Sequence, residues 1–288
     1  MKQRVVILGG SGMLGQELVS LFSHDGISEV IAWSHDDMDV TDLKALRDAL
    51  HTIKPQYIIN STAYNAVDIC ETDDEEYEKA LLLNRDVPGA LALISKEIGS
   101  TFVHYSTDYV FGDYKQQEYG ISEDSIPSPT CRYGVSKYEG EKAVQLNTQK
   151  YYIIRLSRLF GKKGQGSGKK SFFETMLSLS ESKKELQAVG DEVSCFTYAP
   201  DLALATQSLM SDMVPYGIYH LVNEGAVSWH EGLSLAYALL NKGVVLHKVN
   251  GDDFKRQAKR PAFSVLLNTK RPKLRHYKEA LFHFVGQS

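Results

Sequence analysis

The fold is decided near the start of the chain by one stretch, Val5-Val6-Ile7-Leu8-Gly9-Gly10-Ser11-Gly12-Met13-Leu14-Gly15. Its first four residues form a continuous apolar run, which is typical of a strand buried on both faces of a parallel sheet. Apolar residues then recur at helical spacing over residues 13–22. Gly9, Gly12 and Gly15 lie between the two as GxxGxxG, where a tight turn and a helix N-terminus can receive a pyrophosphate. The stretch therefore predicts a dinucleotide site, and the flanking strand and helix disfavour a turn without a ligand.

The rest of the chain alternates apolar runs with helical segments, which predicts an α/β fold with a doubly wound parallel (Rossmann) sheet. Strands are expected at residues 5–8, 30–33, 57–60, 101–105, 151–156 and 217–222. Helices are expected at residues 13–22, 42–50, 75–83, 88–99, 133–146, 172–180, 201–210, about 230–241 and about 277–284. We expect a dinucleotide-binding domain over residues 1–157 plus about 196–222. A smaller, interleaved substrate-binding lobe is expected over about 158–195 and 223–288.

Composition excludes several classes of protein. The 288 residues carry a net charge of −4, which gives no overall case for nucleic-acid binding. Cys70, Cys131 and Cys195 are far apart and lack CxxC spacing, so neither a disulfide framework nor a zinc site is expected. The histidines show no ligand spacing, so no catalytic metal is expected, although a need for magnesium stays open. The N-terminal apolar run is too short for a signal peptide or a membrane span, and we expect a cytoplasmic protein without a membrane partner.

The choice between NADH and NADPH should depend on the segment after the second strand, Ser34-His35-Asp36-Asp37-Met38-Asp39. It contains no Arg or Lys that could hold a 2′-phosphate. Its acidic residues mildly favour NADH, whereas Ser34 and His35 could still accept NADPH. The sequence leaves both cofactors open.

Tyr133 and Lys137 lie one helical turn apart, so their side chains face the same side. A free phenol has a pKa of about 10, which is a poor match to neutral pH. A lysine ammonium in a partly desolvated cleft is expected to lower the pKa of Tyr133 by stabilising its phenolate. Alone, this spacing is a common accident on amphipathic helices. The segment 106–111 adds a hydroxyl, Thr107, at the carboxyl edge of the sheet, and the three side chains together predict carbonyl reduction.

These residues belong to longer motifs. Residues 106–111 read S-T-D-Y-V-F, residues 133–141 read Y-G-V-S-K-Y-E-G-E, and residues 260–266 read R-P-A-F-S-V-L. With residues 39–42 and 60–71, they make the chain resemble, nearly end to end, the dTDP-4-dehydrorhamnose reductase family of the extended short-chain dehydrogenase/reductase superfamily. The 260–266 motif is the most specific, because the wider superfamily does not share it.

The resemblance implies hydride transfer from NADPH or NADH to the C4 ketone of a nucleotide-linked 4-keto-6-deoxy sugar. Tyr133 would donate the proton, Thr107 would orient the carbonyl, and Lys137 would hold the nicotinamide ribose and tune Tyr133. The implied cofactor residues are Gly9, Gly12, Met13, Leu14, Gly15, Ser34, His35, Asp39, Val40, Ala63, Tyr64, Asn84, Tyr133 and Lys137. The implied substrate residues are Val67, Asp108, Arg158 and Arg260. The oligomeric state is left open, a homodimer included.

Departures from the family pattern lie on the substrate side. Arg158 replaces a Trp, Ser171 replaces an Asn, and residues 191–197 lose a Gly and a Pro. We therefore expect a reductase that acts on a different or modified nucleotide sugar. Arg158 is either a substrate-phosphate contact or part of a structural ion pair. The basic, glycine-rich loop at 162–170 is either a pyrophosphate clamp or a solvated surface loop.

Other functions on the same scaffold are a non-catalytic regulatory subunit that binds a dinucleotide, an epimerase and a dehydratase. The intact set of Thr107, Tyr133 and Lys137 argues against the regulatory subunit. A dehydratase should have an acid pair after Thr107, where this chain has only Asp108. The motif that begins at Arg260 is the main evidence against an epimerase.

Overall fold

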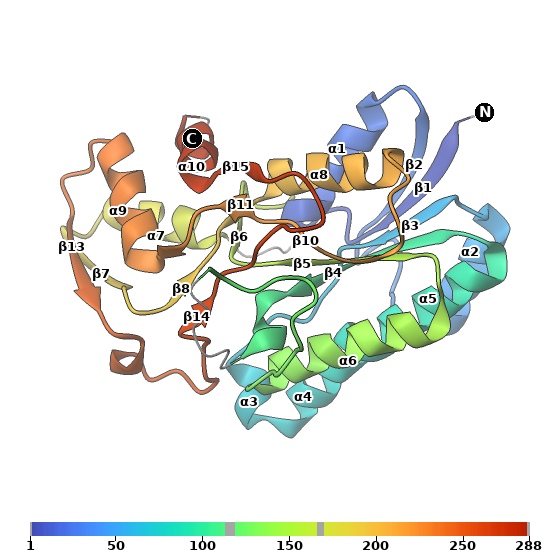
Figure 1. The fold of residues 1–288 in the computed structure, drawn as a ribbon, viewed down its shortest axis with the longest axis horizontal. Helices are drawn as coiled ribbons and strands as arrows, with labels where there is room; N and C mark the ends of the chain where they lie inside the picture. Colours follow the sequence, from blue (N-terminus) through green and yellow to red (C-terminus); the bar gives the residue numbers. More distant parts are fainter. Residues whose placement is uncertain (1, 113–118, 166–169, 287–288) are drawn as a thin grey trace.

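The computed structural model of the protein describes residues 2–112, 119–165 and 170–286, so Gly166–Lys169 of the basic loop lie outside it. Within the described residues, six parallel strands form a central sheet in the order β10-β5-β4-β3-β1-β2 (Figure 1). These strands are β1 (Gln3–Leu8), β2 (Ser28–Trp33), β3 (Tyr57–Asn60), β4 (Thr101–Thr107), β5 (Tyr151–Leu156) and β10 (Gly217–His220). The predicted α/β class with a doubly wound parallel sheet is confirmed.

The apolar run in β1 is continuous because helices cover both faces of the sheet. Val5 and Ile7 pack toward one face, and Val6 and Leu8 toward the other, as the alternation of a strand requires. The first face is covered by α1 (Met13–His24) and α8 (Ala199–Ser211). The second face is covered by α2 (Leu43–Ile53), α5 (Val87–Ile98) and α6 (Arg132–Asn147).

The sheet has a topological switch point beside β1. From β1 the chain passes to β2 on one side and then to β3 on the other. Connections leave the carboxyl ends of β1 and β3 in opposite directions, and doubly wound sheets bind ligands in the crevice at such an edge. The glycine-rich turn and Thr107, at the end of β4, both lie at this edge.

Two expected helices at 75–83 and 88–99 are one continuous helical segment. It consists of α4 (Asp74–Leu81), the π-helix η1 (Leu82–Asp86) and α5. Pro88 lacks an N–H group and cannot bond to the carbonyl of Asn84, so the helix widens at this point instead of ending. Helix α6 packs closely against this widened turn. A Cβ at Gly140 would be only 1.9 Å from the Asn84 carbonyl oxygen, so this contact requires glycine.

A second apolar cluster fills the opposite end of the molecule. It includes Phe160, Phe173, Phe196 and Phe284 and is enclosed by α7 (Phe172–Ser180), α9 (Trp229–Leu239) and α10 (Tyr277–Val285), which Figure 1 shows together beyond the carboxyl ends of the sheet. Strand β7 (Glu185–Val189) pairs with β13 (Val245–Val249) along its outer side. Shorter elements complete this region and its junction: β6 (Leu159–Phe160), β8 (Val193–Ser194), β9 (Thr197–Tyr198), β11 (Asn223–Glu224), β12 (Val227–Ser228), β14 (Phe263–Ser264), β15 (Leu274–His276), α3 (Ile69–Thr72), η2 (Asp108–Phe111) and η3 (Gly251–Asp253).

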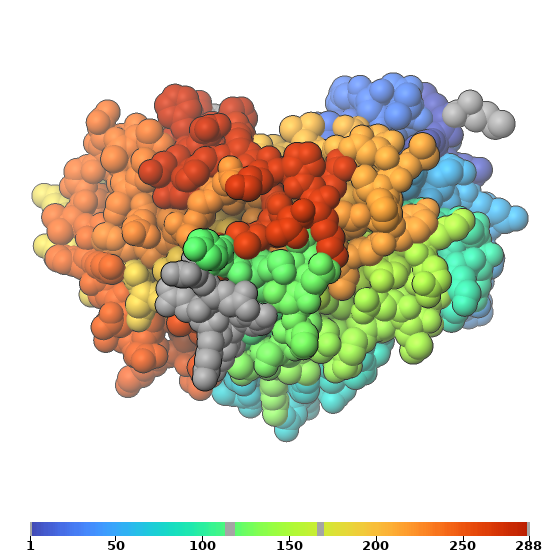
Figure 2. All heavy atoms as spheres, viewed as in Figure 1, coloured from blue at the N-terminus to red at the C-terminus, as the bar shows by residue number. Residues whose placement is uncertain are grey.

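The C-terminal segments return to the sheet instead of staying at that end. Figure 2 shows the red-orange C-terminal chain lying against the green region that follows β4. Here the buried carboxylate of Glu123 accepts hydrogen bonds from the backbone N–H of Thr269 (3.1 Å) and Lys270 (3.3 Å). The expected domain boundaries stay a prediction. No helix in the described part of the chain is long and apolar enough to cross a membrane.

Candidate active site

The glycine-rich turn is built for close backbone approach. Gly9 has φ +78°, and a Cβ at Gly15 would be 2.0 Å from the Gly9 carbonyl oxygen. These positions need glycine, because any side chain would push α1 away from β1. Gly12 is the N-cap of α1 and brings no capping side chain, so the first-turn N–H groups, including those of Met13 and Leu14, face the turn. The arrangement fits a pyrophosphate at a helix N-terminus.

At the carboxyl end of β2, acidic side chains hold the turn that leads to α2. The Asp37 carboxylate accepts hydrogen bonds from the backbone N–H (2.8 Å) and hydroxyl (2.6 Å) of Ser34, which lower the pKa of Asp37. Asp39 likewise accepts hydrogen bonds from the N–H and hydroxyl of Thr41, so its carboxylate holds the turn before α2. His35 is exposed, and Val40 packs partly into the core of the second face.

Asn84, on η1, joins the loop after β3 to helix α6. Its amide Oδ1 accepts from the N–H of Tyr64 (3.0 Å), and its Nδ2 donates to the Tyr64 carbonyl (2.9 Å) and to the Ser136 hydroxyl (3.0 Å). The π-helical turn and Gly140 permit this contact, because they bring α6 against η1. The Ala63–Tyr64 turn is thereby fixed at the crevice, beside the helix that carries Tyr133 and Lys137.

Tyr133 and Lys137 lie in the first two turns of α6, which Cys131 caps through a hydrogen bond from the N–H of Gly134. Burial raises the pKa of Tyr133, and a hydrogen bond with the Thr107 hydroxyl opposes that effect. The expected lowering of this pKa is therefore wrong for the protein without ligands, because burial outweighs the stabilising contacts. The Lys137 ammonium donates to the Tyr105 carbonyl (2.6 Å) on β4.

The pKa of Lys137 is shifted toward neutral pH. Burial lowers the pKa of Lys137 to about 8, and the nearby Glu141 carboxylate opposes the shift. Glu141 forms a buried, two-pronged salt bridge with Arg155 on β5, with distances of 2.8 and 2.7 Å. The lysine therefore lies in a dry environment with one compensating carboxylate, which is already shared with an arginine.

Asp108 follows Thr107 and is buried among hydroxyl groups. The hydroxyl of Thr107 donates to its Oδ1 (3.2 Å) and accepts from the N–H of Tyr109 (3.3 Å). The other oxygen, Oδ2, lies 2.6–3.0 Å from the hydroxyls of Ser157, Ser194 and Ser264. These serines come from distant segments that meet only in the folded chain. Asp108 thus orients the Thr107 hydroxyl and, through the three serines, connects the end of β4 with the C-terminal segments.

The arginines expected near the sugar are both held by protein groups. Arg260 forms a two-pronged salt bridge with Asp68, at 2.9 and 2.6 Å. Arg158 has φ +42°, and its guanidinium lies 4.3 Å above the ring of Trp229. It donates to the backbone carbonyls of Val227 (2.9 Å) and Glu192 (3.0 Å), and no described carboxylate forms a salt bridge with it. Burial lowers the pKa of Arg158, and the charges of Asp108 and Glu192 oppose that shift. The choice between its two expected roles stays a prediction.

The structure brings the catalytic candidates together with the glycine turn, the Ala63–Tyr64 turn and Asn84 at one edge of the sheet. Val67 is half-buried on the loop that continues from that turn, just before Asp68. Sequence reasoning missed the roles of Asp68, Ser157 and Ser194. Asp68 had a signal, since it lies in the 60–71 motif, whereas isolated serines carry none. Among the described residues, no group of three or more His, Cys, Asp or Glu side chains could hold a metal ion.

Comparisons with known proteins agree with this architecture. The sequence profile of the RmlD substrate binding domain matches residues 3–288. The chain is similar to the spore coat polysaccharide biosynthesis protein SpsK of Bacillus subtilis, with 36% identity over 99% of this chain and 97% of that protein. It is similar to the dTDP-4-dehydrorhamnose reductase of Aggregatibacter actinomycetemcomitans, with 34% identity over 93% of this chain and 91% of that protein. The solved structure of Bacillus anthracis dTDP-4-dehydrorhamnose reductase in complex with NADP matches with a TM-score of 0.93 and 30% identity over 100% of both chains.

Proposed function

This chain belongs to the RmlD substrate binding domain family, and we propose that it reduces the C4 ketone of a nucleotide-linked 4-keto-6-deoxy sugar with NADPH or NADH. The observation that carries this proposal is the meeting of Tyr133, Thr107 and Lys137 beside a glycine turn that fits a pyrophosphate. Relatives named as dTDP-4-dehydrorhamnose reductases support the reaction and the substrate class.

The proposed roles follow from the contacts of each side chain. Tyr133 gives its hydroxyl proton to the C4 oxygen, and its raised pKa keeps that proton in place until the oxygen becomes basic. Thr107 orients the carbonyl once its one hydroxyl proton, which Asp108 accepts in the structure, turns to the C4 oxygen. Lys137 holds the nicotinamide ribose and stabilises the phenolate that forms. When bound, the reduced nicotinamide supplies the hydride that completes the alcohol.

The proposed cofactor site includes the turn and helix start, Gly9, Gly12, Met13, Leu14 and Gly15, together with Ser34, His35, Asp39, Val40, Ala63, Tyr64 and Asn84. The hydrogen bond of Asp37 with Ser34 holds a carboxylate at the end of β2, and we propose that the 2′-phosphate of NADPH would come close to it. Like-charge repulsion there favours NADH, and acceptance of NADPH requires a compensating positive charge elsewhere.

The proposed sugar site lies between the end of β4 and the C-terminal segments. Val67 and Arg260 form one wall, and Arg158 with Asp108 forms the other. The family's usual Trp is replaced by Arg158, which is braced on Trp229, and this supports a sugar that differs from the rhamnose precursor. We also propose that the protein acts in the cytoplasm, in the supply of sugars for a cell-surface polysaccharide, which the name of the Bacillus subtilis relative supports.

The test is oxidation of NADH and NADPH by the purified protein with a panel of dTDP-4-keto-6-deoxy sugars, including the rhamnose precursor. We expect turnover that Tyr133→Phe abolishes, with a preference for another member of the panel over the rhamnose precursor. Full turnover of the rhamnose precursor would contradict the altered specificity. Binding of the dinucleotide without turnover of any sugar in the panel would contradict the reductase.

A further inference from the structure

The start of the basic loop packs directly on the glycine-rich turn. Gly164 is buried, and a Cβ there would be 2.3 Å from the carbonyl oxygen of Ser11 and 2.9 Å from the backbone nitrogen of Met13. Both atoms belong to the proposed pyrophosphate site. The four residues Lys162–Gln165, which we call the basic strap, are therefore part of the same surface as the turn. The choice between a pyrophosphate clamp and a solvated loop stays a prediction for the loop as a whole.

The basic strap is fixed on both sides. Gln16, on α1, donates its side-chain amide to the carbonyls of Lys162 (3.1 Å) and Lys163 (3.4 Å). On the other side, the backbone N–H of Lys163 donates to the carboxylate of Glu174 (2.8 Å). Glu174 also closes the capping box of α7. The strap thus bridges the cofactor turn and the second apolar cluster, and its position does not depend on a ligand.

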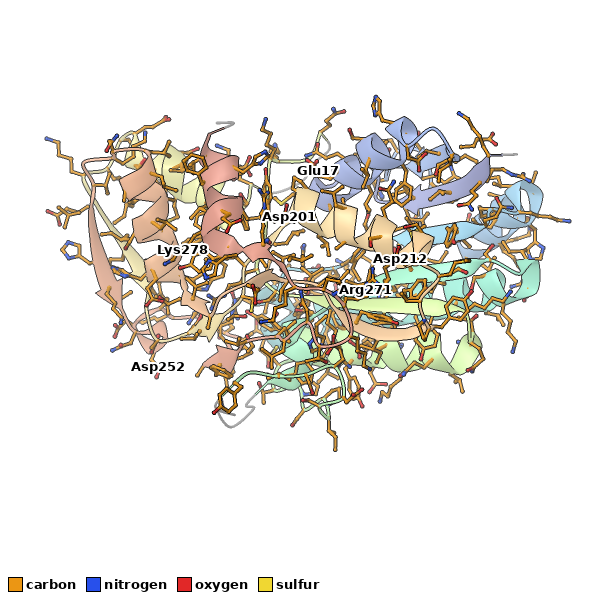
Figure 3. All side chains as sticks on the ribbon, turned by 45° about the horizontal axis from the view of Figure 1, so that its top comes forward. Glu17, Asp201, Asp212, Asp252, Arg271 and Lys278 are labelled. Atoms are coloured by element: carbon orange, nitrogen blue, oxygen red, sulfur yellow. The ribbon has the colours of Figure 1, made fainter. Side chains whose placement is uncertain are left out.

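The strap also supplies positive charge that the turn lacks. The side chains of Lys162 and Lys163 are exposed, and neither forms a salt bridge with another described residue. Burial raises the pKa of Glu17, and the nearby charge of Lys162 opposes that shift. Figure 3 shows Glu17 on α1 where that helix approaches the C-terminal elements. With Asp37 at the end of β2, the turn therefore has an acidic flank and a basic flank.

We propose that the basic strap is a second wall of the dinucleotide site, in which the ammonium groups of Lys162 and Lys163 pair with the phosphates of bound NADPH or NADH. The inference rests on the proposed cofactor use. The N–H groups at the start of α1 would bind one side of a pyrophosphate, and ammonium groups from the adjoining strap would neutralise its remaining charge. NADPH and NADH share the pyrophosphate, so both should depend on these lysines to a similar extent.

The first experiment compares dinucleotide affinity, without sugar, in two doubly substituted proteins. In the test protein, Lys162 and Lys163 are replaced by Gln. In the control, Lys183→Gln and Lys184→Gln remove the same charge from exposed positions of the same region. We expect the Kd for NADPH to rise about tenfold in the test protein, as loss of charge-assisted contacts predicts. The Kd for NADH should rise to a similar extent, and the control should match the unsubstituted protein.

The dependence of the dinucleotide Kd on salt distinguishes direct pairing of the lysines with the phosphates from a change in the conformation of the strap. If the lysines meet the phosphates, the Kd of the unsubstituted protein should rise steeply with ionic strength, and the test protein should lose much of that dependence. Equal affinities and equal salt dependence in the test and control proteins would overturn the proposal. Because binding is measured directly, this failure differs from failure of the proposed function, which would appear as intact binding without turnover.

A second variant examines the contact itself. Gly164→Ala should weaken NADH and NADPH to a similar extent, because its Cβ would displace the backbone of the turn that both share. Thermal unfolding establishes whether the variant is folded. A folded Gly164→Ala variant with unchanged affinity for both dinucleotides would contradict the proposal of a second wall. If Gly164→Ala does not fold, the protein with Lys162 and Lys163 replaced by Gln tests the proposal.

Discussion

At the proton-transfer end of the site, Tyr133 and Lys137 are held by few contacts, namely the Thr107 hydroxyl and the Tyr105 carbonyl. At the sugar end, the polar side chains are already engaged with one another. Asp108 is surrounded by serine hydroxyls, and Arg260 is paired with Asp68. Tyr133 and Lys137 can therefore form further hydrogen bonds with a ligand, whereas Asp108 and Arg260 mainly hold the shape of the site. A substitution at the sugar end should therefore change which sugar fits, and one at the proton-transfer end should change the rate.

The largest effect should come from Tyr133→Phe, which removes the proton donor and keeps the ring. We expect the kcat to fall by about 10²–10⁴-fold, the usual contribution of a positioned general acid. The ring would still contact the Tyr109 ring edge to face, with 5.5 Å between the ring centroids, so the folded structure should persist. Steady-state kinetics with dinucleotide titration measure this, and loss of dinucleotide binding in the variant would contradict the assigned role.

Glu141→Gln should mainly reduce stability. It leaves Arg155 buried without a carboxylate partner, and loss of one partner of a buried salt bridge costs about 3–5 kcal/mol. Chemical denaturation measures this change in the free energy of unfolding. Lys142 and Glu139 form an exposed pair on the same helix, so Glu139→Gln is the matched control and should have little effect. Equal losses in both proteins would contradict the distinction.

The pH dependence of reduction should show the charge of Lys137. Its pKa of about 8 means that the ammonium is present at lower pH and is lost as the pH rises through that value. Turnover should therefore decline above about pH 8, while Tyr133 keeps its proton because its pKa is raised. The Glu141 carboxylate raises the pKa of Lys137. Its removal should therefore lower that pKa and move the decline in turnover to lower pH. A flat profile in that range would contradict the role of the ammonium.

Arg260→Ala should have a moderate effect at the sugar end. It frees Asp68, whose carboxylate would still accept hydrogen bonds from the N–H groups of Gln257 and Ala258. We expect a higher KM for the sugar, an unchanged Kd for the dinucleotide, and a stability loss of about 1 kcal/mol, since the pair is partly exposed. If kcat fell as strongly as in Tyr133→Phe, the two ends of the site would not be separable.

The smallest effect concerns cofactor choice. Asp37→Asn removes the negative charge at the end of β2 and keeps a hydrogen-bond acceptor for Ser34. The ratio of NADPH to NADH affinity should rise by about two- to tenfold, as expected for one exposed charge. The matched control is Asp36→Asn, because Asp36 is an exposed neighbour. The same change in both proteins would contradict a specific role for Asp37.

The parallel sheet and its helices could be predicted because each depends on a local pattern. The run 5–8 alternates between two covered faces, and the glycines that follow it have a backbone role that no other residue can fill. The widening of the helix at Leu82–Asp86 was missed, although Pro88 marks it, because the usual outcome at a proline is an interruption.

The sugar end was harder to predict because its parts are far apart in the sequence. Nothing near Ser157 or Ser194 indicates that both meet Asp108, since the meeting depends on how β5, β8 and β14 pack. Tyr133 shows another limit. Its spacing from Lys137 was read correctly as a shared helix face, but the degree of burial, which decides the direction of the pKa shift, is set by the whole fold.

The salt bridge of Asp68 with Arg260 joins residues 192 positions apart, and this has a consequence for synthesis. The strands β1 to β5, with the glycine turn, Thr107 and Tyr133, are all made before residue 157, and they contain the early part of the site. A ribosome adding about 5–20 residues each second still needs several seconds more to deliver Arg260. During that interval the nascent chain has the proposed proton-transfer residues and lacks Arg260 of the proposed sugar site, so the proposed selectivity would arise last.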